Sequence, residues 1–193
     1  MVVSAPSGTG KTSICREFIK MYPNIEFSVS YTTRPPRPGE VHGKDYYFIS
    51  EDAFKEQIAQ GEFAEWVENY GYLYGTSRKT MSAFLKGTDL ILDVEPRGAK
   101  TLKQNYLGGV FVFILPPSMD ELKWRLSRRG VENEGIMKER LEAAMDEIGE
   151  IVWYDYVIFN DRLERAIDYL RAIYLAEKSR RDRLIGKIRN FLK

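Results

Sequence analysis

Short apolar runs alternate with amphipathic stretches along most of this chain, and the alternation indicates the fold. Residues 2–4 are apolar enough for a short buried strand, and residues 12–21 then carry apolar side chains at helical spacing until Pro23. Further buried strands, each followed by a helical stretch, are predicted at 89–94, 110–115 and 156–159. Strands that alternate with helices predict an α/β fold of three α/β/α layers around a parallel core sheet.

The pattern changes in two parts of the chain. Residues 28–50 are rich in Pro, Gly, Tyr and Arg, and residues 62–76 alternate aromatic and polar side chains with glycine breaks. Both features are typical of short strands and turns, so we expect an inserted β-rich lobe at 30–88. The charged residues 125–140 predict a mobile lid. The remainder is expected to form the core of a single domain, at residues 1–29, 89–124 and 141–193. A long helix that ends basic is predicted from Asp161 onward.

Composition favours one folded domain with no polyelectrolyte partner. The 193 residues are 44% hydrophobic and 30% charged, which suits a substantial core and argues against disorder. A formal net charge of +1 gives no global attraction to nucleic acid. Residues 175–193 carry seven Lys or Arg against two acids, a local balance of +5. A solvated helix is the favoured interpretation of that segment, and RNA or membrane contact is less favoured.

Cysteine usage and hydropathy predict a compartment. The single cysteine, Cys15, excludes an internal disulfide and is consistent with a reducing environment. No apolar run approaches the ~20 residues that span a bilayer, and no charged and apolar leader precedes the first strand. We therefore expect a cytoplasmic protein without a membrane partner.

The segment S-A-P-S-G-T-G-K-T, residues 4–12, has the composition of a phosphate-binding loop (P-loop) between a strand and a helix. Backbone N–H groups of a Gly-rich turn and the positive end of the next helix form a concavity for phosphate oxygens. Lys11 would reach the terminal phosphates, and the Thr12 hydroxyl would complete the shell of a Mg²⁺ ion. Ala5 replaces the first glycine of the usual pattern, and a plain strand-to-helix connection is the alternative. The residues expected to bind a nucleoside triphosphate are Pro6, Ser7, Gly8, Thr9, Gly10, Lys11 and Thr12.

A second anion site is predicted in the proline-rich segment that begins at Ser30. Arg34 and Arg37 lie three residues apart on a chain stiffened by prolines, so they lose little entropy when they clamp one anion. With Ser30 and Tyr46 as hydroxyl donors, a phosphate monoester fits. The alternative is a surface loop whose arginines are solvated.

These motifs, in this order and spacing, resemble the guanylate kinase family from the P-loop to about Ala172. The resemblance implies a parallel-sheet core, a β-rich GMP-binding lobe and a lid. It also implies the reaction of ATP and GMP to ADP and GDP with Mg²⁺. The residues it assigns to the GMP phosphate are Arg34, Arg37, Tyr46 and Tyr74, with Ser30 close by.

The resemblance further assigns guanine recognition to Glu65 and Thr76. The chemistry agrees, because the N1–H and the exocyclic NH₂ of guanine are adjacent donors that one carboxylate can accept, and a hydroxyl can donate to O6. Adenine has an acceptor at N1, and a polar site built for donors can reject such an analogue by about 10⁴-fold. Without the resemblance, Glu65 would be interpreted as an outward residue of an alternating strand.

Two acids follow the predicted strand 89–94. Asp93 is placed to hold Mg²⁺ or its waters, and a helix cap is the alternative. Glu95 stands where the family usually has Asp, which contributes to guanine binding. Pro96 and Arg97 also depart from the family pattern, and Pro96 is expected to begin a helix.

Arginines of the predicted lid complete the site that the resemblance implies. Arg125 and Arg129 share one face of a predicted helix, and Arg140 comes from the next helix. They would gather around the transferring phosphoryl group, where two like charges ~4 Å apart repel by about 4 kcal/mol at an effective dielectric of 20. Asn160 matches a residue near the adenine of ATP, although an Asn-Asp pair also suits a helix start.

We therefore expect a guanylate kinase in which positioning and electrostatics supply catalysis. The residues expected to act on the phosphoryl group are Lys11, Arg34, Arg37, Arg125, Arg129 and Arg140. One alternative is a catalytically silent guanylate-kinase-like module that binds proteins, and another is a P-loop kinase for a different monophosphate or a phosphorylated sugar. Either a monomer or a homodimer is compatible with the sequence, and the use of dGMP stays open.

Overall fold

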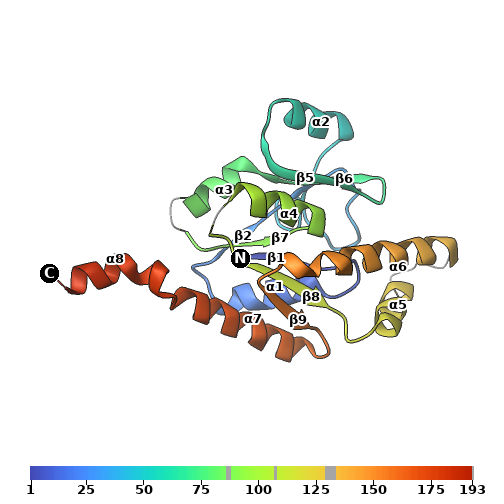
Figure 1. The fold of residues 1–193 in the computed structure, drawn as a ribbon. Helices are drawn as coiled ribbons and strands as arrows, with labels where there is room; N and C mark the ends of the chain where they lie inside the picture. Colours follow the sequence, from blue (N-terminus) through green and yellow to red (C-terminus); the bar gives the residue numbers. More distant parts are fainter. Residues whose placement is uncertain (86–87, 107, 129–133, 193) are drawn as a thin grey trace.

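A computed structural model describes residues 1–85, 88–106, 108–128 and 134–192 of the chain (Figure 1). Its centre is a five-stranded sheet in the order β2-β7-β1-β8-β9. Every pairing between these strands is parallel, which confirms the predicted parallel core sheet. The strands are β1 (Val2–Ser4), β2 (Glu26–Ser28), β7 (Leu90–Asp93), β8 (Phe111–Leu115) and β9 (Tyr156–Phe159).

Helices cover both faces of this sheet because successive strand residues point to opposite sides. Val3 packs in one core with α1 (Lys11–Met21) and α7 (Leu163–Lys178). Val2 packs in another with α3 (Arg78–Leu85) and α4 (Pro96–Asn105). The predicted α/β/α layering is therefore confirmed (Figure 1).

The predicted β-rich insertion forms a second, four-stranded sheet in the order β4-β3-β6-β5. Its strands are β3 (Tyr31–Thr32), β4 (Tyr47–Phe48), β5 (Phe63–Asn69) and β6 (Tyr72–Ser77), and α2 (Glu51–Ala59) joins β4 to β5. Phe54 of α2 stacks on Phe63 with ring centroids 4.4 Å apart, and Leu73 joins the same small core. The insertion therefore has a core of its own above the main sheet (Figure 1).

Helices form around Arg125 and Arg140, as the sequence predicts. Arg125 lies in α5 (Met119–Ser127), and Arg140 lies in α6 (Glu134–Gly149), which a short 3-10 helix, η1 (Glu150–Trp153), follows. Leu122 and Leu126 of α5 pack with Met137 and Ala144 of α6, and this apolar contact explains why both segments are ordered as helices. Residues 129–133, with Arg129, lie outside the described part of the chain.

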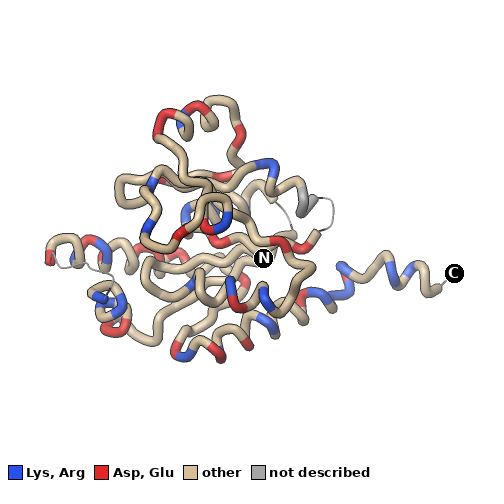
Figure 2. The backbone as a smooth tube through the Cα atoms, turned by 180° about the vertical axis from the view of Figure 1, so that it is seen from behind, with Lys and Arg blue, Asp and Glu red and all other residues tan. Residues whose placement is uncertain are grey.

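The long helix predicted from Asp161 onward is divided into two, of which the first is α7. After α7, the backbone of Arg180 is extended, at φ −59° and ψ 133°, and a separate helix α8 (Arg181–Phe191) follows. Buried Glu177 accepts a hydrogen bond from Tyr156 Oη, and its carboxylate pairs with Arg180 and Arg183, which fixes the chain at the break. Helix α8 extends away from the body and carries several basic residues (Figure 2).

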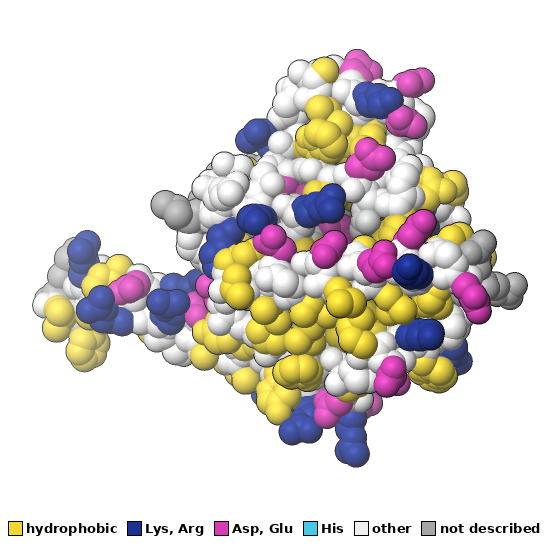
Figure 3. Space-filling model, turned by 45° about the vertical axis from the view of Figure 1, so that its right-hand side comes forward, with side chains coloured by type: hydrophobic (Ala, Val, Ile, Leu, Met, Phe, Trp, Pro, Cys, Tyr) yellow, Lys and Arg dark blue, Asp and Glu magenta, His cyan; other side chains and the backbone are white. Residues whose placement is uncertain are grey.

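Apolar side chains also reach the surface of the core. In the view of Figure 3, exposed apolar side chains gather on the lower half of the molecule, below a band of charged residues. Exposed examples on the edge strand β9 are Val157 and Phe159. None of the helices within the described ranges is both long enough and apolar enough to cross a bilayer.

We predict that Gly75→Ala destabilises the second sheet. A Cβ on Gly75 would lie 2.9 Å from Phe63 Cδ1 and 3.0 Å from Phe54 Cζ, so the stacked rings would have to shift. Overpacking of this kind costs about 1–3 kcal/mol, which lowers the melting temperature by several degrees in a chain of this size. The control is Gly149→Ala, where the new Cβ meets nothing within 4 Å. Equal melting temperatures for the two variants would contradict this packing.

Candidate active site

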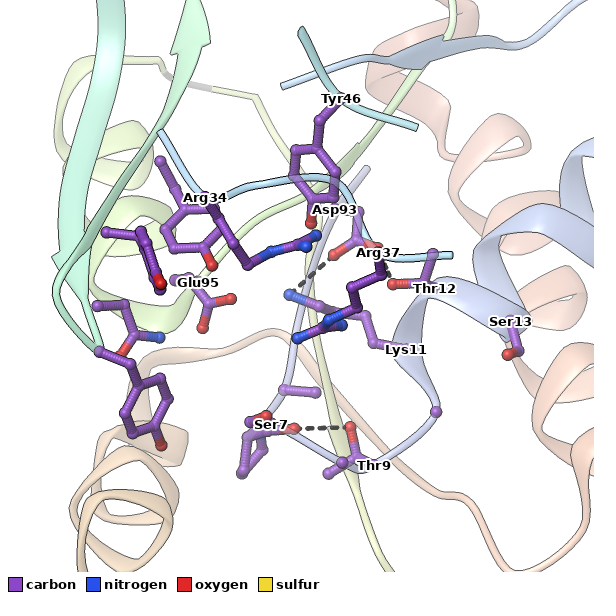
Figure 4. A pocket seen from close by; sticks show the side chains of 18 of the residues that line it. Ser7, Thr9, Lys11, Thr12, Ser13, Arg34, Arg37, Tyr46, Asp93 and Glu95 are labelled. Carbon is purple, nitrogen blue, oxygen red and sulfur yellow. Dashed lines mark hydrogen bonds and ion pairs between the residues drawn. The ribbon is translucent and has the colours of Figure 1, made fainter. Parts of the chain in front are cut away.

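A cavity of about 400 Å³ lies between the carboxyl ends of the core strands and the second sheet (Figure 4). All of residues 6–12 line it from the core side. Arg34, Arg37, Tyr46 and Tyr74 line it from the opposite side. The structure therefore brings the two predicted anion sites into one cavity.

The loop before α1 has the shape that the P-loop prediction requires. Gly8 and Gly10 adopt φ of 95° and 92°, which L side chains rarely do. A Cβ on Gly10 would also lie 2.6 Å from Asn160 Nδ2. The backbone N–H and the Oγ1 hydroxyl of Thr9 both donate to the carbonyl oxygen of Pro6, which closes the turn. Because α1 begins at Lys11, its free N–H groups face the cavity and favour an anion.

Lys11 and Thr12 are both held by Asp93 at the end of β7. Lys11 Nζ lies 2.8 Å from Asp93 Oδ1 and donates to the Val94 carbonyl oxygen at 2.7 Å. Thr12 Oγ1 donates to Asp93 Oδ2 at 2.7 Å (Figure 4). Burial alone would lower the pKa of Lys11, but the carboxylates of Asp93 and Glu95 outweigh burial and raise that pKa. Lys11 therefore carries a positive charge, and Asp93 and Val94 hold its amino group beside the loop.

The Thr12 hydroxyl and the Asp93 carboxylate also fit a magnesium ion. Both present oxygen atoms, the donors that Mg²⁺ prefers, and both line the cavity beside the loop. Across the described residues, no three His, Cys, Asp or Glu side chains gather as a metal site. A magnesium ion here would therefore need substrate phosphate oxygens and waters as further ligands.

Arg34 is buried beside an acid that the sequence analysis did not single out. Its Nη2 donates to Glu40 Oε1 at 2.8 Å, and its Nη1 donates to the Pro35 carbonyl oxygen at 2.7 Å. Glu40 Oε2 also accepts from the backbone N–H of Arg37 at 2.7 Å. One carboxylate thus fixes the side chain of Arg34 and the backbone at Arg37. Figure 4 shows Arg34 and Arg37 directed toward Lys11.

Two predicted hydroxyl donors are placed differently from one another. Tyr46 lines the main cavity, and burial, followed by the charge of Asp93, raises the pKa of its hydroxyl. Ser30 lies behind it in a smaller recess that Thr12, Tyr46 and Asp93 also line. Ser30 is therefore beside the clamp but on the far side of Tyr46.

Glu65 and Thr76 form a buried pair where the second sheet meets α4. Thr76 Oγ1 donates to Glu65 Oε1 at 2.6 Å, and the two residues are only 5% and 0% exposed. The interpretation of Glu65 as an outward strand residue is therefore wrong. Its register shows why, because an irregularity between Phe63 and Glu65 interrupts the alternation of β5. A Cβ on Gly98 would overlap Glu65 Oε2, so only glycine at this position leaves room for the carboxylate.

Glu95 stands at the start of α4 and faces the same cavity. It is the N-cap residue, and Pro96 is the first residue of α4, so the helix predicted to begin at Pro96 is confirmed. Asp93 is therefore not the helix cap. Burial raises the pKa of Glu95, and its buried Oε2 has no hydrogen-bond partner within the described ranges.

Arg125 and Asn160 lie behind the P-loop rather than in the cavity. Arg125 donates to the carbonyl oxygens of Thr9 and Asn160, both at 3.1 Å, and to Glu121 Oε1 at 2.8 Å. The buried side chain of Asn160 donates to the same Thr9 oxygen at 2.6 Å. Both side chains therefore support the loop from below. Arg140 differs, because it lines the cavity itself.

The sequence analysis missed the tip of the β5–β6 hairpin. Asn69, Tyr70 and Tyr72 all line the cavity beside the P-loop. The signal for it was the glycine in the motif N-Y-G-Y, which is typical of a two-residue hairpin turn. Only the folded arrangement places that turn next to Arg140.

We predict a pH-dependent gain in stability for Glu65→Gln. Burial raises the pKa of Glu65 from its ordinary 4.5 to about 7. A raised carboxyl pKa contributes stability that is fully present below 4.5 and is lost as pH rises through 7. The amide of Glu65→Gln does not ionise, so its stability does not fall over that pH range. The free energy of unfolding in urea, taken as the variant minus the wild type, should therefore grow from pH 5 to pH 8 by an amount on the order of a few kcal/mol. A difference that stays constant across this range would contradict the burial of a charged Glu65.

Comparison with known proteins identifies the family. The family model described as guanylate kinase matches residues 1–177. A guanylate kinase of Syntrophus aciditrophicus is 58% identical over 193 residues, which cover 100% of this chain and 93% of the relative. One of Geobacter metallireducens is 50% identical over 188 residues, covering 97% and 93%. The crystal structure of guanylate kinase from Anaplasma phagocytophilum superposes with a TM-score of 0.78 at 34% identity, covering 93% of this chain and 85% of that one. The chain, with its P-loop and its arginine clamp in one cavity, belongs to the guanylate kinase family.

Proposed function

We propose that this chain transfers the γ-phosphoryl group of ATP to GMP and releases ADP and GDP. The observation that carries the proposal is the shared cavity, which residues 6–12 line on one side and the Arg34–Arg37 clamp lines on the other. Two anionic substrates placed at these sites would meet end to end. The β-rich lobe 30–88 would bind GMP, and segment 125–140 would act as a lid over the phosphates.

The triphosphate of ATP is assigned to residues 6–12. The N–H groups of the loop and of the first turn of α1 would receive its oxygens, and Lys11 would exchange Asp93 for a phosphate oxygen. Mg²⁺ bound at Thr12 and Asp93 would neutralise charge on the phosphates. Asn160 and Arg125 would hold the loop in shape through the Thr9 carbonyl oxygen.

GMP is assigned to the opposite side of the cavity. Arg34 and Arg37 would clamp its phosphate, with the hydroxyls of Tyr46 and Tyr74 as further donors. Glu65, Thr76 and Glu95 would receive the guanine, and Ser30 would support Tyr46. The donors of guanine would favour the charged form of Glu65, which offsets its burial.

Phosphoryl transfer would be direct, from ATP to a phosphate oxygen of GMP. That oxygen forms a bond to the γ-phosphorus while the bond from the γ-phosphorus to the bridging oxygen of ADP breaks, so no covalent enzyme intermediate is needed. Cys15 is fully buried, and burial raises the pKa of its thiol, which makes it a poor nucleophile. Lys11, Arg34, Arg37 and Arg140 would instead hold the two anions together, and Arg129 would join them from the lid.

The intact chemistry of the loop favours an enzyme over a silent binding module. Lys11, Thr12 and Asp93 are in contact, as a working P-loop requires, and the arginine clamp is formed. ATP and GMP are therefore the proposed partners, without nucleic acid or membrane, in a cytoplasmic monomer or homodimer.

The experiment that tests the function measures ADP release with ATP, Mg²⁺ and each of GMP, dGMP, AMP, CMP and UMP. We expect the wild type to prefer GMP over AMP by about 10⁴-fold in kcat/KM. Glu65→Gln should lower kcat/KM for GMP at least about 100-fold, because a carboxylate that accepts two hydrogen bonds is lost, while the KM for ATP stays the same.

Glu68→Gln is the matched control, since Glu68 lies on the same strand with its side chain exposed. Turnover of another monophosphate in place of GMP would contradict the proposed substrate, and no turnover at all would favour the silent module. Unchanged GMP kinetics in Glu65→Gln would remove Glu65 alone from the base site.

A further inference from the structure

The tip of the β5–β6 hairpin carries an aromatic residue in an unfavourable backbone conformation. Asn69 pairs with Tyr72, and the two residues between them, Tyr70 and Gly71, have φ of 50° and 74°. Such a turn favours Asn, Asp or Gly at its first position. Tyr70 is the single non-glycine residue with positive φ in the described ranges. The left-handed conformation costs an L residue roughly 1–2 kcal/mol, so the side chain merits a functional explanation.

The Tyr70 ring contacts a cation from the other side of the cavity. The guanidinium carbon of Arg140, on α6, lies 5.0 Å from the centroid of the Tyr70 ring. Both residues line the cavity that the P-loop forms. Arg140 is half-buried, and no described residue accepts a hydrogen bond from its buried Nε. Within the described ranges, the Tyr70 ring is therefore a contact that positions this guanidinium.

The partner of an arginine decides which of its N–H groups stay available to a substrate. Arg34 has a carboxylate as partner, whereas Arg140 has an aromatic ring. Glu40 binds Arg34 through the in-plane donors of its guanidinium, so those donors are occupied before any substrate arrives. The Tyr70 ring offers Arg140 no oxygen acceptor, so contact with the ring leaves guanidinium N–H groups to bind phosphate oxygens. Burial raises the pKa of the Tyr70 hydroxyl to about 12, so the ring stays neutral at physiological pH.

We propose that Tyr70 is a positioning residue that orients Arg140 toward the transferring phosphoryl group. The inference rests on the proposed function, which places Arg140 at that group. Tyr70 belongs to the second sheet, whereas α6 packs on α5 beside the core, so the contact also joins the two sides of the cavity (Figure 1). Movement of the hairpin toward bound GMP would therefore change the placement of Arg140.

The test compares Tyr70→Asn with Tyr70→Phe. Asn removes the ring but suits the left-handed turn, so its melting temperature should equal or exceed that of the wild type. Its kcat should fall about three- to thirty-fold with both KM values within about twofold, because a partly buried cation–π contact is lost. Phe keeps the ring and should retain kcat within about twofold. Arg140→Ala and the double variant Tyr70→Asn/Arg140→Ala complete a mutant cycle.

The mutant cycle tests the role of Tyr70 separately from the proposed kinase function. If Tyr70 acts through Arg140, the double variant has the kcat of Arg140→Ala, because the ring has nothing left to orient. The role of Tyr70 would be overturned if the kcat losses of the two single variants multiplied in the double variant. An unchanged kcat in Tyr70→Asn, or a change confined to the KM for GMP, would also overturn it. In each case the proposed kinase function would stand. An unchanged kcat in Arg140→Ala would overturn the assignment of Arg140 and the inference with it.

Discussion

The contact of Lys11 with Asp93 is the interaction on which the rest of this site depends. It joins the loop after β1 to the end of the neighbouring strand β7, and Thr12 binds the other oxygen of the same carboxylate. An unpaired buried lysine would be strongly destabilising, so Asp93 balances its charge while no phosphate is present. If a triphosphate takes Lys11 from Asp93, the Mg²⁺ proposed at Thr12 and Asp93 would balance the carboxylate in its place. The folded chain thus keeps a cation beside the loop at a modest free-energy cost.

The same principle governs the other charged groups of the cavity, with a different partner for each. Glu40 balances Arg34, the Tyr70 ring holds Arg140, and the carbonyl oxygens of Thr9 and Asn160 receive Arg125. Two acids are the opposite case, since burial raises the pKa of Glu65 and of Glu95. Burial disfavours the charged form of both carboxylates, although Thr76 already donates one hydrogen bond to Glu65. The cavity is therefore suited to receive anions between the P-loop and the arginines.

The sequence predicted what depends on local pattern and left out what depends on tertiary contacts. Apolar runs located β1, β7, β8 and β9, and the spacing of Gly8, Gly10 and Lys11 located the loop. The approach of Tyr70 to Arg140 was not predictable, because it joins segments whose distance only the fold determines. The irregularity after Phe63 and the pairing of Glu40 with Arg34 are local, but the residue pattern did not indicate the backbone conformation that each requires. The break before α8 was also missed, since it depends on buried contacts of Glu177. The roles assigned to the site residues came from resemblance to the family. The structure supplies a physical reason for where several of these residues lie.

The most direct test of this account is a crystal structure of the chain with ADP, Mg²⁺ and GMP bound together. The account predicts the β-phosphate within residues 6–12, Lys11 Nζ moved from Asp93 to a phosphate oxygen, and the GMP phosphate between Arg34 and Arg37. A GMP phosphate bound away from that pair of arginines, or a Lys11 that keeps Asp93 and contacts no phosphate, would contradict it.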